Sequence, residues 1–349
     1  MEPYDDTCEK LVEFLGINQL RPRLTIKTYE KIGDGSMCEG VYKGQAKDTR
    51  RKYAVKVFRI NPDIVTCAKN GQNALLDDAA GKSIKDAVKE FKEISKFQQE
   101  NLVKYFYIDT QLDGRRQQYQ LHIAMERCYG SALLDDMRQH YGLYSTGYSS
   151  ADCTAYLENA VSGLHFLHQH KIVHRDLRPE NLLFAETNRK TLKIADYSAV
   201  VKLDGSLTQS GEVTTTGGPP WAYQAPEVAN KKFGNPGRRS DVWSLACVLI
   251  FMLQGKDPFF QYRSRHVILA KSSADIRRAL LDGHAPYIDG DFQRKKVHGN
   301  EEAFLHSAKD FLRLCLIARS TERADMNKMS KHMLLKSTAP AAARSCNIL

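Results

Sequence analysis

The sequence lacks both a long hydrophobic run and closely spaced cysteines. No apolar stretch in its 349 residues approaches the roughly 20 residues that a membrane-spanning helix needs. The eight cysteines are scattered along the chain, and none forms the C-x-x-C pair that is typical of zinc sites. We therefore expect no membrane span, no zinc site and no disulfide framework. Thiols without partners are typical of a reducing compartment, so we expect a cytoplasmic protein.

The sequence also lacks a concentrated basic stripe, although its formal net charge is +10. Such a charge could favour nucleic acid, anionic lipid or acidic substrates. Here the lysines and arginines are spread along the chain, whereas nucleic-acid-binding proteins gather them on one face. We therefore expect no nucleic-acid partner.

Strand patterns dominate the first part of the chain. After a short leader at 1–24, β-like runs fill residues 24–57, and two further strands are expected at 102–109 and 118–127. Between these strands, apolar residues at helical spacing predict a helix over 84–97. The first part of the chain is therefore predicted to form a sheet and one amphipathic helix.

Helix patterns dominate the chain after Cys128. Helices are expected at 149–170 and at 240–255, with Ser149 or Ser150 and then Ser240 as their caps. The interior of 240–255 is almost wholly apolar, which predicts a buried helix. Two stretches rich in turn residues, 61–83 and 261–300, resemble insertions.

The strongest chemical motif is the stretch "IVHRDLRPENLL". It places Asp176 and Asn181 five positions apart, and the following stretch "LKIAD" ends on Asp196. Carboxylate and amide oxygens are the ligands that Mg²⁺ prefers in proteins. These three residues are therefore candidates for one metal-binding reaction centre.

The stretch "HRDLRPENLL" resembles the catalytic loop of the eukaryotic protein kinases, and its H-R-D-x-x-x-x-N element is specific. Other stretches follow the order of that family from about residue 24 to 336. "KIGDGSMCEGVYKG" resembles the glycine-rich loop, "YAVK" the strand with the phosphate-binding lysine, "IADYS" the metal-binding segment and "YQAPEV" the end of the activation segment. Two stretches also look somewhat like the kinase part of the endoplasmic-reticulum stress sensor that is also a ribonuclease. That second likeness carries no functional expectation.

The resemblance implies an α+β protein with the two-lobed protein-kinase fold. A kinase domain at 25–336 would comprise a strand-rich N-lobe at about 25–126 and a helical C-lobe at about 129–336. A leader at 1–24 and a tail at 337–349 would flank it. The cofactors implied are ATP and Mg²⁺, and the second substrate is a protein hydroxyl.

The resemblance also assigns roles to the residues of the motifs. Asp176 would accept or orient the proton of the substrate hydroxyl, while Asn181 and Asp196 would hold Mg²⁺. Arg178 stands where serine/threonine kinases usually have a lysine that faces the γ-phosphate. Its guanidinium could neutralise developing charge with a more fixed geometry.

Lys56 would hold the phosphates of ATP, with an acidic partner on the following helix. The family register points to Glu90, with Glu93 as the alternative. The remaining ATP-binding residues would lie in the glycine-rich loop, the adenine pocket, the hinge and the catalytic loop: Ile32, Gly33, Gly35, Val41, Ala54, Met125, Glu126, Cys128, Glu180 and Leu183.

Four further residues fit structural roles in the same family. His174 would be a packed core residue rather than a base, and Asp241 would bind backbone amides of the catalytic loop. Glu227 and Arg323 would form an ion pair within the C-lobe.

The sequence departs from the family pattern at the glycine-rich loop and at the metal-binding segment. In the loop, either Gly40 replaces the third glycine after a one-residue lengthening, or Cys38 replaces it. In "ADYS", Tyr197 can pack as the usual phenylalanine does, whereas Ser198 reaches fewer backbone conformations than glycine. We expect Ser198 to affect switching between active and inactive states more than the chemical step.

These departures leave alternatives open. A pseudokinase scaffold is supported by the altered loop, by Ser198 and by Pro220. The presence of Lys56, Asp176, Asn181 and Asp196 favours an active enzyme. Pro220 and Arg178 resemble tyrosine kinases, and dual specificity is a further alternative. Pro179 and Glu180 match the serine/threonine form of the catalytic loop, which we favour.

Two further expectations concern modification. In protein kinases that have an arginine directly before the catalytic aspartate, as Arg175 would be here, this arginine often binds a phosphate on the activation segment. The candidate acceptors are Thr208, Ser210, Thr214, Thr215 and Thr216. The final residues fit C-a-a-X, which predicts prenylation of Cys346 and peripheral membrane attachment aided by nearby lysines.

Overall fold

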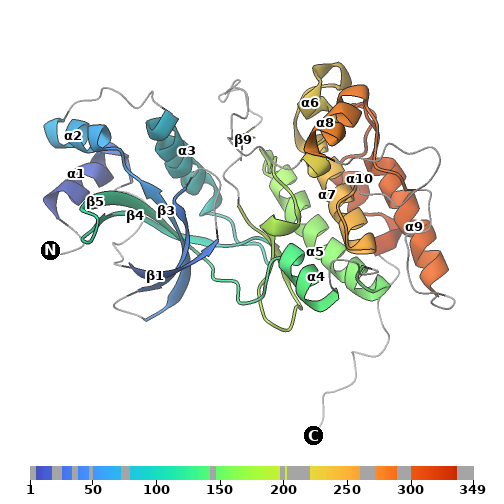
Figure 1. Ribbon diagram of the computed structural model, residues 1–349, viewed down its shortest axis with the longest axis horizontal. Helices are drawn as coiled ribbons and strands as arrows, with labels where there is room; N and C mark the ends of the chain where they lie inside the picture. The colour runs from blue at the N-terminus through green and yellow to red at the C-terminus, as the bar shows by residue number, and fades with distance from the viewer. Residues whose placement is uncertain are drawn as a thin grey trace, which may run out of the picture. The chain divides into compact units, whose positions relative to one another are not determined.

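The computed structural model divides the chain into two compact units. The N-terminal unit comprises Met1–Tyr129 and Asp196–Ser198, and the C-terminal unit comprises Gly130–Ala195 and Ala199–Leu349. Figure 1 labels their helices and strands. The structure describes residues 5–17, 26–33, 38–46, 50–71, 79–141, 147–196, 201–202, 221–259, 272–288 and 300–335.

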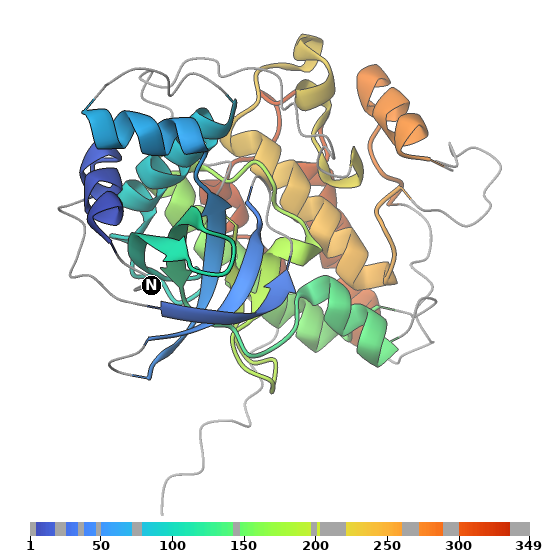
Figure 2. The same cartoon turned by 60° about the vertical axis from the view of Figure 1, so that its left-hand side comes forward.

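The N-terminal unit is built on a five-stranded antiparallel sheet with the strand order β1-β2-β3-β5-β4. Its strands are β1 Ile26–Gly33, β2 Gly40–Ala46, β3 Lys52–Arg59, β4 Tyr105–Asp113 and β5 Gln118–Met125. The strands expected from the sequence are thus present, and the turn between β4 and β5 makes them antiparallel neighbours. Figure 2 shows the curved sheet from a second direction.

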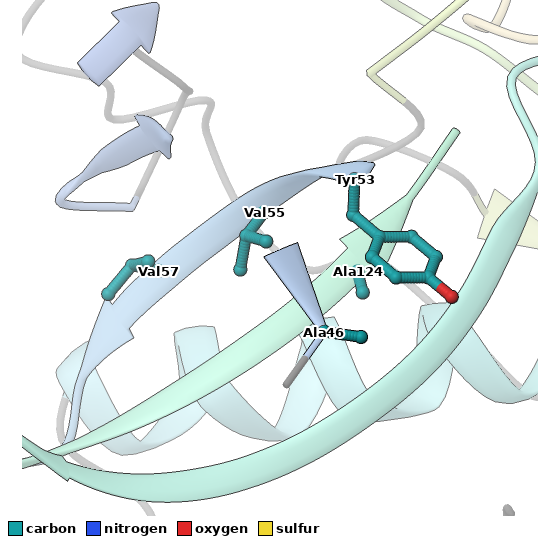
Figure 3. Packing of buried hydrophobic residues seen from close by; sticks show 5 residues of the cluster. All are labelled: Ala46, Tyr53, Val55, Val57 and Ala124. Atoms are coloured by element: carbon teal, nitrogen blue, oxygen red, sulfur yellow. The ribbon is translucent and has the colours of Figure 1, made fainter. Parts of the chain in front are cut away.

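One face of this sheet carries a compact apolar core. Tyr53, Val55 and Val57 alternate along β3, so all three side chains point to the same face. They pack with Ala46 and Ala124, as Figure 3 shows. The ring of Tyr53 meets the rings of Phe106 and Tyr107 edge-on, each at a centroid distance of 5.8 Å.

Two helices, α1 Asp6–Phe14 and α2 Pro62–Asn70, pack on each other in the N-terminal unit, and α1 also packs on β4 (Figure 1). The hydroxyl of Thr110 on β4 donates a buried 3.0 Å hydrogen bond to the carbonyl of Cys8. The hydroxyl of Tyr119 donates to the Asp5 carboxylate at 2.7 Å. Part of the expected leader is therefore a helix fixed to the sheet.

The expected insertion at 61–83 begins as a regular helix, which corrects the sequence interpretation of a turn-rich stretch. Asn61 caps α2 by accepting the backbone N–H of Asp63 at 3.0 Å, and Pro62 occupies the first turn. Gly71 ends the helix in the left-handed region at φ 65°. The residues that suggested turns are helix-terminating residues. The helix α3 Ala79–Ile94 follows.

The C-terminal unit is mainly helical. Its longer helices are α4 Leu133–Tyr141, α5 Ser150–Gln169, α7 Arg238–Gln254, α8 Ser273–Asp282 and α9 Asn300–Cys315. The short helices are η1 Pro179–Asn181, η2 Trp221–Tyr223, α6 Pro226–Ala229, η3 Lys231–Phe233, α10 Met326–Met329 and η4 Met333–Leu335. The strands β6 Ile172–Val173 and β9 Val201–Lys202 pair with each other, as do β7 Leu182–Phe184 and β8 Leu192–Ile194.

The predicted buried helix is confirmed as α7, since every residue from Ser240 to Leu253 is buried. The helix begins at Arg238, earlier than expected, and Ser240 is not its cap. The Ser240 hydroxyl instead accepts the backbone N–H of Gly237 at 3.0 Å. For α5 the cap is Ser149, whose hydroxyl accepts the N–H of Asp152. Within the described ranges no helix is long and apolar enough to cross a membrane.

Together the two units give the expected fold class, a strand-rich N-terminal part and a helical C-terminal part. The α8 helix occupies part of the stretch at 261–300, and most of the remaining residues there lie outside the described ones.

Candidate active site

The loop that follows β6 is held by one buried carboxylate. Asp241 on α7 accepts the backbone N–H groups of His174 and Arg175, each at 2.8 Å. The ring of His168 on α5 lies 2.8 Å from the same carboxylate. The expected amide-binding role of Asp241 is confirmed. The contact between His168 and Asp241 was not predicted, because the sequence gives no signal for the distant partner of a histidine on the apolar face of a helix.

His174 is fully buried and uses both ring nitrogens in structural hydrogen bonds. Its Nε2 lies 2.9 Å from the carbonyl of Ala195, and its Nδ1 accepts the backbone N–H of Asp176 at 3.2 Å. The carbonyl can only accept, so Nε2 carries the proton. The expectation that His174 is a packed residue rather than a base is confirmed.

Arg175 has a backbone φ of 70°, in the left-handed region that non-glycine residues rarely adopt. Such a conformation costs on the order of 1 kcal/mol or more and tends to occur at functional sites. Burial lowers the pKa of the Arg175 guanidinium, while the charge of Asp241 acts in the opposite direction. The two backbone hydrogen bonds to Asp241 offset the conformational energy of the Arg175 backbone. They also hold the chain in place directly before Asp176.

Asp176 and Asn181 are in direct contact. The amide nitrogen of Asn181 donates to the backbone carbonyl of Asp176 at 2.7 Å and to its carboxylate Oδ2 at 3.0 Å. These two bonds orient the amide, so its oxygen points away from Asp176. A buried amide oxygen is a hard ligand that fits Mg²⁺.

Arg178 lies beside this pair. Its Nε is 3.6 Å from Oδ2 of Asp176, and its NH1 is 3.7 Å from Oε1 of Glu180. Arg178 thus places a fixed positive charge next to the Asp176 carboxylate. Glu180, which was expected to bind ATP, therefore forms an ion pair with Arg178.

The chain from Asn181 to Ala195 is held by the β7–β8 pair. The backbone N–H of Ala195 donates to the carbonyl of Asn181 at 2.8 Å, and Asp196 is the next residue. Leu183, expected to line the adenine site, lies on β7 opposite Lys193 and is half-buried.

In the N-terminal unit, Lys56 and Asp196 form a close ion pair. Lys56 Nζ lies 2.5 Å from Asp196 Oδ1, and the two side chains are 5% and 17% exposed. Like Arg175, Asp196 is a non-glycine residue in the left-handed region, with a φ of 57°. The expected lysine partner was Glu90, whose side chain lies outside the described residues, so that assignment and its alternative Glu93 stay predictions.

Beside Lys56 the sheet presents the residues expected to bind the base. Ala54 and Met125 are opposite each other on β3 and β5, and both are buried. Ile32 on β1 is 43% exposed, which is high for a large apolar side chain. Val41 pairs with both Gly33 and Lys56.

The expected hinge residues follow β5. The backbone N–H of Glu126 donates to the carbonyl of Lys104 at 2.7 Å. Cys128 is half-buried.

At the glycine-rich loop, Gly40 occupies the position that needs glycine. It begins β2 with a φ of 156°, and a Cβ there would lie 3.3 Å from the carbonyl oxygen of Gly33. This conformation favours the interpretation that Gly40 replaces the third glycine after a one-residue lengthening. Gly35 lies outside the described residues.

Several other expected residues also lie outside the described part of the chain. They are Tyr197, Ser198, Thr208, Ser210, Thr214, Thr215, Thr216, Pro220 and Cys346. Among the described residues no group of three or more histidine, cysteine, aspartate or glutamate side chains could hold a metal ion. The metal donors offered by the motifs are instead one amide and single carboxylates, a set suited to a cation that also binds phosphate and water.

The expected ion pair of the C-terminal unit is confirmed. Arg323 NH1 lies 2.6 Å from Glu227 Oε1, and NH2 lies 2.9 Å from Oε2. Both side chains are fully buried, and the Arg323 guanidinium stacks 5.0 Å from the ring of Trp243.

The family described as the protein kinase domain matches residues 26–335. Human mitogen-activated protein kinase kinase kinase 4 is 29% identical over 308 residues, which are 88% of this chain and 16% of that protein. Mitogen-activated protein kinase kinase kinase 5 of Arabidopsis thaliana is 27% identical over 312 residues, 36% of its length. Serine/threonine-protein kinase fray1 of Dictyostelium discoideum is 26% identical over 308 residues, 45% of its length. The chain thus spans less than half the length of each of these relatives.

Proposed function

The chain belongs to the protein kinase family, and we propose that it is an active enzyme that transfers the γ-phosphoryl group of ATP to serine or threonine hydroxyls of a protein. The name of one relative, serine/threonine-protein kinase fray1, supports the serine/threonine class. The proposal of activity is supported mainly by the geometry of the catalytic loop. Asp241 binds the loop backbone, and Asn181 donates a hydrogen bond to the Asp176 carboxylate.

In the proposed reaction the substrate hydroxyl oxygen attacks the γ-phosphorus, the bond to the β-phosphate oxygen breaks, and ADP leaves. Asp176 accepts the hydroxyl proton, and its carboxylate is already oriented by Asn181 and flanked by Arg178. Such a site works mainly by positioning and by stabilising charge. The Arg178 guanidinium would offset the negative charge that spreads over the transferred group.

ATP and Mg²⁺ are part of this proposal. Asn181, through its amide oxygen, and Asp196 would hold the cation, and Lys56 would bind phosphate oxygens. When bound, Mg²⁺ neutralises phosphate charge and fixes the phosphate geometry. Lys56 already sits beside Asp196, so its ammonium is close to the carboxylate that the cation would share.

The test is phosphate transfer from labelled ATP by the wild-type protein, Asp176→Asn and Lys56→Met. We expect transfer by the wild type and at least about a hundredfold loss in each variant, since each removes a group that acts on the transferred phosphate. Equal inactivity of all three proteins with every substrate tried would favour the pseudokinase scaffold. Phosphoamino-acid analysis of the product separates serine/threonine from tyrosine or dual specificity.

Membrane attachment through a prenylated Cys346 remains a separate proposal that rests on the C-a-a-X sequence alone. Mass spectrometry of the native protein tests it directly. An added isoprenoid on Cys346 supports it, and an unmodified C-terminal peptide contradicts it.

A further inference from the structure

Glu39 stands where the glycine-rich loop rejoins the sheet. Its backbone N–H donates to the carbonyl of Val57 on β3 at 2.8 Å, and the next residue, Gly40, pairs with Val57 as the first residue of β2. The backbone of Glu39 therefore sets where this end of the loop meets β3.

The side chain of Glu39 is held by three donors, although it lies on a loop. Its Oε1 accepts from Arg59 NH2 at 3.0 Å and also from Arg116 NH1, and its Oε2 accepts from Gln120 Nε2 at 3.3 Å. The carboxylate is only 11% exposed. The Arg59 hydrogen bond, followed by that of Arg116, holds the pKa of Glu39 below its usual value, so it is ionised at neutral pH.

The donors are themselves fixed, and they come from separate parts of the unit. Arg116 belongs to the turn between β4 and β5, where its backbone N–H donates to Asp113 and its Nε lies 3.9 Å from the same carboxylate. Gln120 on β5 lies 3.0 Å from the ring of His122, which is buried. Glu39 therefore ties the loop end to β3, to β5 and to the β4–β5 turn at once.

This network acts from the side of the sheet opposite Lys56. Arg59 and Lys56 are three residues apart on β3, and side chains at odd spacing point to opposite faces of a strand. The Lys56 side chain is 5% exposed and bound to Asp196, whereas the Arg59 side chain is 55% exposed. Glu39 and its donors thus need not touch a nucleotide to influence the loop that covers it.

We propose that Glu39 is a positioning residue that fixes the end of the lengthened glycine-rich loop and thereby sets the affinity for the ATP phosphates. The inference rests on the proposed kinase function. The end of the loop at Glu39 is held because its carboxylate accepts hydrogen bonds from β3, from β5 and from the β4–β5 turn.

The test compares wild type with Glu39→Gln, which keeps the shape of the side chain and removes its charge. Loss of the charge-assisted hydrogen bonds should raise KM for ATP and Kd for MgATP roughly tenfold. In the same variant kcat at saturating ATP should change by less than about twofold, because Glu39 does not contact the reacting atoms. Kd is measured by calorimetry, which does not depend on phosphate transfer.

The matched control is Glu30→Gln. Glu30 also pairs with a basic residue on the same sheet, with Lys43 Nζ 2.6 Å from its carboxylate, but its side chain is 57% exposed and it lies on β1. KM and Kd should stay at the wild-type values in this variant. A double variant, Glu39→Gln with Arg116→Gln, should be no worse than the poorer single variant, because both act through one network.

The outcomes separate the inference from the proposed function. Wild-type protein that neither binds MgATP nor transfers phosphate would overturn the kinase proposal itself. Active wild type together with a Glu39→Gln variant of unchanged Kd overturns the role of Glu39. A lowered thermal midpoint with unchanged KM also overturns it, since that result would mark a purely structural ion pair.

Discussion

The carboxylate of Asp241 lies 2.8 Å from the backbone nitrogen of Arg175, the residue immediately before Asp176. One side chain on α7 therefore holds the strained backbone at Arg175, directly before Asp176, the proposed base. The same carboxylate also binds His174 and His168, so its removal would release three hydrogen bonds in a buried site.

We predict that Asp241→Asn lowers both stability and activity. Neutralising a buried carboxylate with three donors should cost about 2–4 kcal/mol in the free energy of unfolding. kcat should fall at least about tenfold, since misplacement of a reacting group by a fraction of an ångström is costly. Denaturant unfolding and steady-state kinetics measure the two effects. Asp310→Asn, at the surface pair with His332, should change neither, and equal effects of the two variants would contradict the prediction.

The Glu227–Arg323 pair predicts a second stability effect. Arg323→Lys keeps the positive charge but cannot form both hydrogen bonds to Glu227 or stack in the same way on Trp243. We expect it to lower the free energy of unfolding by about 3 kcal/mol, because a buried carboxylate loses part of its compensation. Arg319→Lys is the control, since Arg319 pairs with Glu322 at 4.0 Å on the surface. Urea melts of both variants should differ clearly, and similar midpoints would show that the buried pair is dispensable.

His122 predicts a dependence of stability on pH. Burial lowers its pKa from 6.5 to about 4, against the opposing charges of Asp113 and Glu39. The unfolded chain takes up a proton below about pH 6.5 while the folded protein does not, so stability is lost as pH falls from about 6.5 toward 4.

Between about pH 7 and pH 5 this residue should remove about 2 kcal/mol from the free energy of unfolding. The measurement compares wild type with His122→Gln in urea melts at both pH values. The variant should lose less stability than wild type on acidification. Parallel losses would mean that His122 is solvated or protonated in the folded protein.

The thiols predict a selective pattern of labelling. Cys247 and Cys315 are fully buried, and burial raises the pKa of both far above its usual value. Cys38 and Cys128 are half-buried. A thiolate-directed reagent should therefore modify Cys38 and Cys128 at least about tenfold faster than Cys247 and Cys315. Peptide mass spectrometry after timed labelling resolves the sites, and fast modification of Cys247 in folded protein would contradict the packing of α7.

The sequence was sufficient for the fold class and for the contacts that a motif implies. The strands β1–β3 and the buried helix α7 follow from residue types and spacing, and the Glu227–Arg323 pair follows from the family resemblance. Likewise, Asp241 could be assigned to the catalytic loop through the family resemblance.

Contacts between residues that lie far apart in the sequence could not be predicted from residue type and spacing. Glu39 meets Arg116 and Gln120 across separations of 77 and 81 residues, and no periodicity relates these positions. The α2 helix was missed for a local reason: the residue types at Asn61 and Gly71 are common in turns as well as at helix ends. The packing of α1 on β4 depends on the finished sheet, which the residues of the leader do not indicate.

The packing of α1 has a practical consequence for experiments with a shortened chain. The family match starts at residue 26, yet the fully buried Leu11 and the Thr110–Cys8 hydrogen bond place part of the unit's interior before that point. A fragment trimmed to the family limits would leave the apolar surfaces of α2 and β4 open to water, and such surfaces favour aggregation. Poor solubility of that fragment would then report the missing helix rather than an intrinsic defect of the kinase domain.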